Sequence, residues 1–316
     1  MKKKSSISPK ILKKLPKIND IKISVTNCGL KNNNKDDLVL IKLPRMSKIF
    51  GFFTDSKMPG ESIKWNRSII KYGKVSAILI NSGNANVFNG IKGERSQEKI
   101  INEISQSLKI SKKEIYIAST GVIGELLDEK KIIKSIPKLI SELSCSSEVW
   151  YRAANAIRTT DTFPKLNSKI IALSQNKIKI NGIAKGSGMV SPNMATMLAF
   201  IFTDANFKHF ISKKKIQDLV DKTFNSISVD GDKSTSDMFL FISVNSKVEK
   251  YIEKKEIDIF LNKLRDLMED LAIQIVRDGE GAKKLIEINI SGTNNNKDAK
   301  MIAMSITNSL LFKTAM

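Results

Sequence analysis

The sequence predicts an α/β protein in which layered, mixed β-sheets are sandwiched by helices, arranged as two intimately packed lobes. Three apolar runs have the length and composition of strands buried on both faces: 75–80, 196–203 and 239–244. Other segments repeat Ile and Leu at helical spacing, most clearly 256–276. With 316 residues, of which 41% are hydrophobic, the chain is long enough to bury a large core.

The predicted elements mix strands and helices along the whole chain. Strands are predicted at 37–43, 50–54, 75–80, 114–118, 168–174, 178–184, 196–203, 239–244 and 284–291. Helices are predicted at 96–108, 129–143, 148–158, 211–226 (capped by Ser212), 256–276 and 298–311. The basic residues 1–17 are predicted to be a flexible, solvated lead-in. The segment NSGNAN at 81–86 is predicted to be a turn, which either lines a site or is simply an ordered turn.

The net charge of +21 comes almost entirely from Lys. A polyanion-binding surface and a general Lys bias in composition both explain such a charge. The Lys residues are spread along the chain, aromatic residues make up only 6%, and Arg, the usual residue for base and phosphate contacts, is scarce. We therefore favour the compositional explanation and expect no nucleic-acid partner.

Cysteine and histidine usage restricts the chemistry further. Cys28 and Cys145 are far apart and neither belongs to a CxxC pair, which fits a reducing compartment and argues against a cysteine metal site. His209 is the single histidine and lies in a polar segment, so a Ser-His-Asp triad or a His-rich zinc site is not expected. No apolar run reaches the roughly 18 residues of a membrane helix, and the N-terminus lacks the apolar core of a secretory signal. We expect a cytoplasmic protein without metal or membrane partner.

The stretch 185–204, KGSGMVSPNMATMLAFIFTD, is the strongest candidate for the chemistry. Its first half, 185–195, is rich in the turn-forming residues Gly, Ser, Pro and Asn and leads into the apolar strand. Thr196 lies at the junction. If the Ala195–Thr196 bond is cut, Thr196 gains an α-amine beside its own hydroxyl, and an amine with a pKa near about 8 can serve as the general base. The simpler alternative is a loop that leads into a core strand.

This stretch resembles the signature of the ornithine acetyltransferase family, the bifunctional glutamate N-acetyltransferases, whose precursor cleaves itself at an Ala-Thr bond. Further motifs are similar to that family: NSGNANVFNG, TTDTFPK, VDGDKSTSD and RDGEGA. The resemblance implies a fold like that of N-terminal-nucleophile enzymes. It also implies a precursor that separates into an α chain, 1–195, and a β chain, 196–316, which assemble as a heterotetramer of two α and two β chains.

The resemblance assigns roles to residues that have ordinary structural alternatives. Thr120 and Gly121 match the family's oxyanion site, although by themselves they read as a strand–helix loop. Thr160, with Thr159 as a rival, matches a substrate-contacting threonine. Lys185 is expected to hold a substrate carboxylate, although it could be one more surface lysine. Glu280 lies between two glycines and is expected to bind a substrate ammonium; the alternative is a solvated turn.

The implied reaction moves an acetyl group from N2-acetylornithine to glutamate through an acetyl ester of Thr196, as a step of arginine biosynthesis. No cofactor is expected, and acetyl-CoA is a possible second donor. The chain stops at KTAM, whereas the family continues with a segment that supplies an Asn and a Thr or Ser to the substrate. The alternatives are a self-cleaving aminopeptidase or amidohydrolase, an inactive truncated homologue, and a basic nucleic-acid-binding protein.

Overall fold

The computed structural model describes residues 4–10, 14–32, 34–191, 197–206, 211–246 and 249–316. Its strands are β1 (Lys22–Thr26), β2 (Leu38–Phe53), β3 (Lys74–Asn84), β4 (Ile115–Val122), β5 (Lys165–Ala172), β6 (Lys177–Lys185), β7 (Leu198–Thr203), β8 (Ala205–Asn206), β9 (Met238–Ser243) and β10 (Lys250–Tyr251). Its α-helices are α1 (Glu61–Ile69), α2 (Gly90–Leu108), α3 (Glu129–Ser141), α4 (Ser147–Ala156), α5 (Lys213–Lys222), α6 (Ile257–Arg277), α7 (Asn296–Asn308) and α8 (Leu310–Ala315).

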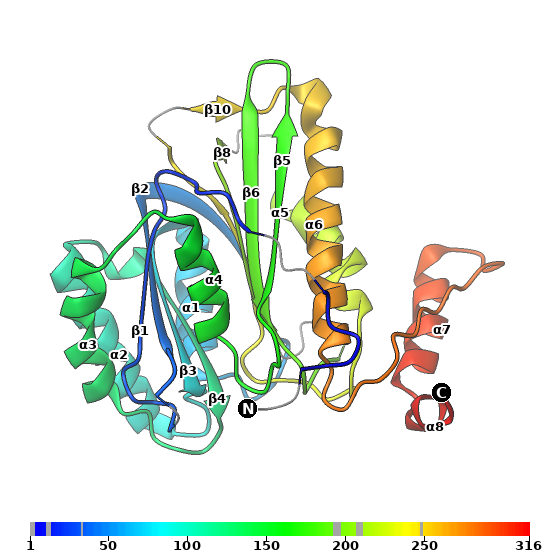
Figure 1. The fold of residues 1–316 in the computed structure, drawn as a ribbon, viewed down its shortest axis with the longest axis horizontal. Coiled ribbons are helices and arrows are strands. Elements are labelled where there is room, and N and C mark those ends of the chain that lie inside the picture. Colours follow the sequence, from blue (N-terminus) through cyan, green and yellow to red (C-terminus); the bar gives the residue numbers. More distant parts are fainter. Residues whose placement is uncertain (1–3, 11–13, 33, 192–196, 207–210, 247–248) are drawn as a thin grey trace.

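Eight of these strands form one mixed sheet in the order β4-β3-β2-β9-β7-β6-β5, with β1 paired to β2, while β8 and β10 form a separate pair. The 16-residue β2 belongs to both halves of the large sheet, because its first part pairs with β1 and β3 and its last part with β9. Between Lys42 and Ser47 the pairing of β2 with β3 shifts register, and Met46 has a φ of 66°. Such a bulge bends a strand, and Figure 1 shows β2 curving over between the two halves.

The two faces of the sheet bury separate clusters, because side chains alternate along each strand. Val39 and Ile41 of β2 pack in the same cluster as Phe200 of β7 and Leu240 of β9, so the two halves of the sheet share one central core. Figure 1 shows α2 and α3 on the outside of one half and α6 on the outside of the other. Their apolar faces complete two outer clusters, which gives the predicted layers of mixed sheet sandwiched by helices.

Most predicted elements are present in the structure. The observed bounds differ from the predicted ones in β2, in β3 and in the helix predicted at 211–226. The segments 37–43 and 50–54 are parts of the single strand β2, and β3 continues to Asn84 through most of the predicted turn. The predicted helix 211–226 is capped by Ser212, whose side chain accepts from the Lys215 N–H, but it ends at Lys222 and is followed by a 3-10 turn, η3 (Phe224–Ser226).

Two sequence predictions are wrong. Residues 1–17 are not wholly a solvated lead-in, because Leu15 is only 1% exposed and packs with Ile18 in the central cluster. Residues 284–291 form no strand, since no strand of the described part of the chain pairs with them and their alternating pattern alone cannot satisfy the backbone. They lead instead to α7 and α8, which have no buried residue and stand apart from the layers in Figure 1.

The remaining short turns are η1 (Ile70–Tyr72), η2 (Lys112–Glu114) and η4 (Lys254–Glu256). Within the described ranges, no helix combines the length and the apolar composition that crossing a membrane requires.

Candidate active site

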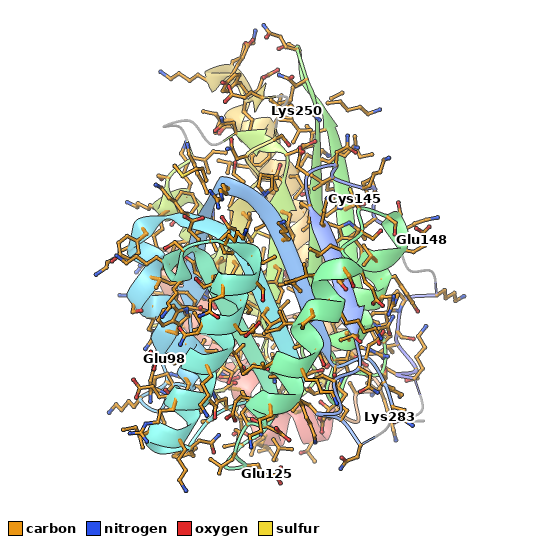
Figure 2. All side chains as sticks on the ribbon, turned by 90° about the vertical axis from the view of Figure 1, so that its left-hand side faces the viewer. Glu98, Glu125, Cys145, Glu148, Lys250 and Lys283 are labelled. Carbon is orange, nitrogen blue, oxygen red and sulfur yellow. The ribbon has the colours of Figure 1, made fainter. Side chains whose placement is uncertain are left out.

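A cleft of about 1390 Å³ opens where β4 and β6 end. Its lining includes every described residue for which a catalytic or substrate-binding role was predicted, together with the rival Thr159: Thr120, Gly121, Thr159, Thr160, Lys185 and Glu280. Figure 2 shows Glu125, which follows β4, and Lys283, which follows Glu280, at the same lower end of the molecule, opposite Lys250. The lining of the cleft brings together segments that are far apart in the sequence.

The end of β4 is built around two glycines. Strands β3 and β4 run parallel, and their register shifts where Gly83 lies opposite Gly121. Gly121 has a φ of 133°, and a Cβ on it would lie 2.3 Å from the carbonyl carbon of Gly83. Only glycine fits there. Thr120, which is 8% exposed, is held at the wall of the cleft by this contact.

Lys185 is the last residue of β6 and is only 3% exposed, so the surface-lysine alternative is wrong. Its Nζ donates to the hydroxyl of Thr159 at 2.8 Å and to that of Thr120 at 3.3 Å. Burial lowers the pKa of this ammonium, and the charge of Asp161 opposes the shift. The backbone of Lys185 lies opposite Leu198 in the antiparallel pair β6–β7.

Thr160 and Glu280 are connected through Ser187. The hydroxyls of Thr160 and Ser187 are 2.6 Å apart, and the Glu280 N–H donates to the Ser187 carbonyl at 2.9 Å. The Glu280 carboxylate is exposed and lies over Gly188, where an added Cβ would be 2.9 Å from Oε1. Thr159 and Thr160 thus face different partners in the same cleft, and the assignment of the substrate contact to Thr160 stays a prediction.

Beneath the cleft lies a buried ionic cluster that was not predicted from the sequence. Lys165 Nζ donates to Asp161 at 2.7 Å and to Asp278 at 2.6 Å, and all three side chains are fully buried. Asp161 also accepts from the Gly186 N–H at 2.7 Å. Burial alone would raise the pKa of Asp161, but the charges of Lys165 and Lys185 hold it below its ordinary value. The signal was present, because all three residues lie within TTDTFPK and RDGEGA.

Two further acids lie close to the turn-rich stretch. Asp230 accepts from the backbone N–H groups of Met189 and Val190 at 2.6 and 2.9 Å. Asp237 is fully buried, and the backbone of Met197 and the side chain of Ser234 lie close to its carboxyl. Burial raises the pKa of this carboxyl well above its ordinary value.

The predicted nucleophile Thr196 and the preceding Ala195 lie outside the described residues, as does His209. The strand that follows Thr196, β7, begins at Leu198 opposite Lys185. The described part of the cleft offers a hydroxyl and a backbone N–H at Thr120 and Gly121, a buried cation at Lys185 and an exposed anion at Glu280. These groups suit a small substrate that carries charges of both signs.

The fold has a solved counterpart in the L-aminopeptidase D-Ala-esterase/amidase of Ochrobactrum anthropi, described as a variant of the Ntn-hydrolase fold. The TM-score is 0.50 at 10% sequence identity, over 86% of this chain and 89% of that chain. At this identity the likeness concerns the fold alone. The protein thus has an α/β fold with the layered architecture of the Ntn-hydrolase type.

A family model described as the ArgJ family matches residues 22–316. The arginine biosynthesis bifunctional protein ArgJ of Bartonella henselae is 38% identical over 314 residues, which is 98% of this chain and 76% of that protein. The protein of that name from Rhizobium meliloti is 39% identical over 318 residues, with the same shares. The chain belongs to the ArgJ family, whose members are acyltransferases of arginine biosynthesis.

Two solved structures of such proteins are similar to this one. ArgJ of Bacillus halodurans superposes with a TM-score of 0.52 at 29% identity and covers 56% of this chain and 91% of its own. Ornithine acetyltransferase of Mycobacterium tuberculosis, complexed with ornithine, gives a TM-score of 0.51 at 25% identity and covers 55% of this chain and 91% of its own.

Proposed function

We propose that this enzyme transfers an acetyl group from N2-acetylornithine to glutamate, through an acetyl ester on Thr196. The observation that carries the proposal is the gathering of Thr120, Gly121, Lys185 and Glu280 in one cleft from three separate segments. The family supports the substrate, since a similar acetyltransferase has been solved with ornithine.

The reaction begins with cleavage of the Ala195–Thr196 bond, which divides the chain into residues 1–195 and 196–316. The new amine of Thr196 takes the proton of its own hydroxyl, and Oγ attacks the acetyl carbonyl of N2-acetylornithine. Ornithine leaves with a proton on its α-nitrogen. The α-amine of glutamate then attacks the ester carbonyl, forms the new amide and returns the threonine hydroxyl.

Negative charge on the attacked carbonyl oxygen is stabilised by Thr120 and the N–H of Gly121. Thr120 Oγ1 accepts from the Lys185 ammonium at 3.3 Å, so its own hydroxyl hydrogen remains available to donate to the oxyanion. The cationic neighbour makes that hydroxyl a stronger donor. Hydrogen bonds aimed at developing charge are a large catalytic term, worth about 10²–10³ in rate for one donor.

The two charged residues of the cleft orient the donor. Lys185 binds the α-carboxylate, since a buried ammonium without a salt bridge to a carboxylate in the described part of the chain gains most from an incoming anion. Glu280 binds the δ-ammonium of ornithine, and Thr160, which is linked to Glu280 through Ser187, also contacts the substrate. Acetyl-CoA serves as a second donor, no further cofactor takes part, and two copies of each piece assemble as a cytoplasmic heterotetramer.

The proposal is tested with N2-acetylornithine that carries a ¹³C-labelled acetyl group. Incubation of the purified enzyme with this donor and glutamate should give labelled N-acetylglutamate and free ornithine in equal amounts. Release of labelled acetate, with no transfer to glutamate, would instead identify a hydrolase. A Lys185→Met variant should raise the KM for the donor, whereas Lys138→Met, on the exposed face of α3, should not.

A further inference from the structure

The cleft is larger than one amino acid needs. Its volume of about 1390 Å³ exceeds the range of roughly 300–1,000 Å³ that is common for small-molecule sites. Beyond Lys185 its wall continues over the loop before β2 and over the residues that follow α4. Two cations of this outer part, Lys31 and Arg158, have no role in the reaction described above.

Lys31 is fixed by a rigid loop. The buried carboxylate of Asp37 accepts from the backbone N–H groups of Cys28 and Leu30 at 2.7 Å and of Lys31 at 3.0 Å. The Lys31 ammonium donates to the carbonyls of Ala156 at 2.9 Å and of Asp36 at 3.3 Å. An ammonium has three hydrogens, so one remains for a ligand after these two bonds within the described chain.

Arg158 lies on the same wall, one residue before Thr159. Among the described residues its guanidinium makes two long hydrogen bonds, from Nε to the Asn155 carbonyl at 3.4 Å and from Nη1 to the Asp161 carbonyl at 3.5 Å. Burial lowers the pKa of Lys31 to about 8; the carboxylate of Asp37 opposes the shift, and the charges of Arg158 and Lys185 add to it. The cations therefore lie close enough to repel one another.

The nearby acids do not neutralise this pair. Asp161 is bound to Lys165 at 2.7 Å, and Asp36 is bound to Arg152 at 3.1 Å. Neither Lys31 nor Arg158 has a carboxylate within 4.0 Å in the described part of the chain. Asp37 and Asp161 act on Lys31 only from a longer distance. Two half-buried cations on a cleft wall, with no ion pair in the described part of the chain, can therefore bind an incoming anion.

We propose that Lys31 and Arg158 form a second subsite, which binds the side-chain carboxylate of the glutamate acceptor. This inference rests on the proposed function. The cleft must receive in turn a side chain that ends in an ammonium and one that ends in a carboxylate. Glu280 attracts the first and repels the second, so the acceptor places its side chain on the cationic part of the cleft, at Lys31 and Arg158. The planar fork of Arg158 suits a carboxylate.

The test compares Arg158→Met and Lys31→Met with Arg95→Met, a control at an exposed position of α2. Two reactions are followed. Transfer to glutamate uses the new subsite, whereas acetyl exchange between N2-acetylornithine and labelled ornithine does not. Each cleft variant should raise the KM for glutamate roughly 10- to 100-fold, the size expected for one hydrogen bond to a charged group. Exchange should change far less, and the preference for glutamate over glutamine should shrink in parallel.

Three results would overturn the subsite. An equal effect on transfer and on exchange would indicate a general structural role, and a normal KM for glutamate would show that its side chain binds elsewhere. If the variants raised only the KM for acetyl-CoA, the two cations would bind the phosphate groups of that donor instead. If the wild-type enzyme exchanges no acetyl group, the proposed function fails, and calorimetric binding of glutamate to wild type and Arg158→Met still decides whether the subsite exists.

Discussion

Lys185 combines three properties that are seldom found together in one side chain. It is almost completely buried, it donates to two threonine hydroxyls of the cleft, and its pKa is lowered because burial disfavours the charged form. A lysine in this state binds an anion strongly while it is protonated. Its neighbour Asp161 opposes the loss of the proton but is itself bound to Lys165.

The lowered pKa of Lys185 predicts the pH dependence of donor binding. Lys185 carries its charge below its pKa in the free enzyme and loses it as the pH rises, at a lower pH than an ordinary lysine. Affinity for N2-acetylornithine, measured by calorimetry between about pH 6 and pH 10, should therefore fall on the alkaline side. The Lys185→Met variant is the control for titration of the ligand itself. This variant should bind N2-acetylornithine weakly, and its affinity should not fall on the alkaline side. Parallel curves for both proteins would contradict the prediction.

The raised pKa of Asp237 predicts how the stability of the folded protein depends on pH. Burial raises the pKa of its carboxyl in the folded state, so the folded protein binds this proton more tightly than the unfolded chain. Above the unfolded pKa of about 3.9, this group lowers the stability as the pH rises, up to the raised folded pKa. Asp237→Asn removes that loss. The free energy of unfolding in urea, measured near pH 5 and near pH 8, should favour the variant more at the higher pH; an equal difference at both would refute this.

At the scale of elements, the end of β4 depends on Gly121. An alanine there would place its Cβ 2.3 Å from the Gly83 carbonyl carbon, at a φ of 133°. We expect Gly121→Ala to cost more than the roughly 1–3 kcal/mol of backbone strain alone, and to lower turnover about 10²–10³-fold by moving an oxyanion donor. Gly124→Ala is the matched control, since Gly124 also has a positive φ but an added Cβ meets nothing within 4 Å. Similar losses of turnover in both would argue against an oxyanion role.

The cluster around Lys165 joins the start of β5 to the turn after α6. Lys165→Met would leave the carboxylates of Asp161 and Asp278 buried without their shared cation. We expect a loss of roughly 3–5 kcal/mol in the free energy of unfolding. Lys233→Met breaks an exposed pair with Asp55 of 3.1 Å and should cost less than about 1 kcal/mol. Chemical denaturation of both variants measures the difference, and comparable losses would mean that the buried cluster adds no special stability.

At the scale of the whole molecule, local patterns predicted the strands and helices better than their connections. The strands at 75–80 and 239–244 were recognisable because both of their faces are buried, so they are apolar throughout. The arch of β2 was not, since residues 44–48 interrupt its apolar pattern and only the partner strands show that the backbone continues. Leu15 was hidden by the lysines around it, although it packs in the core.

The site was predictable through motifs rather than through chemistry visible in single residues. Thr120, Thr160, Lys185 and Glu280 each had an ordinary structural explanation, and only the resemblance to a family linked them before the structure placed them in one cleft. Lys31 and Arg158 lie outside those motifs. Their position depends on long-range contacts, such as that between Lys31 and Ala156, which no local pattern encodes.

The proposed mechanism requires that one chain be converted into two, and the mass of the intact protein tests this most directly. The purified wild-type protein should give two species, with the masses of residues 1–195 and 196–316, and the second should gain one acetyl group after brief exposure to N2-acetylornithine. Thr196→Ala should give a single uncut chain that gains none. A wild-type protein that stays in one piece, or a cut protein whose acetyl group lies on another residue, would contradict the mechanism.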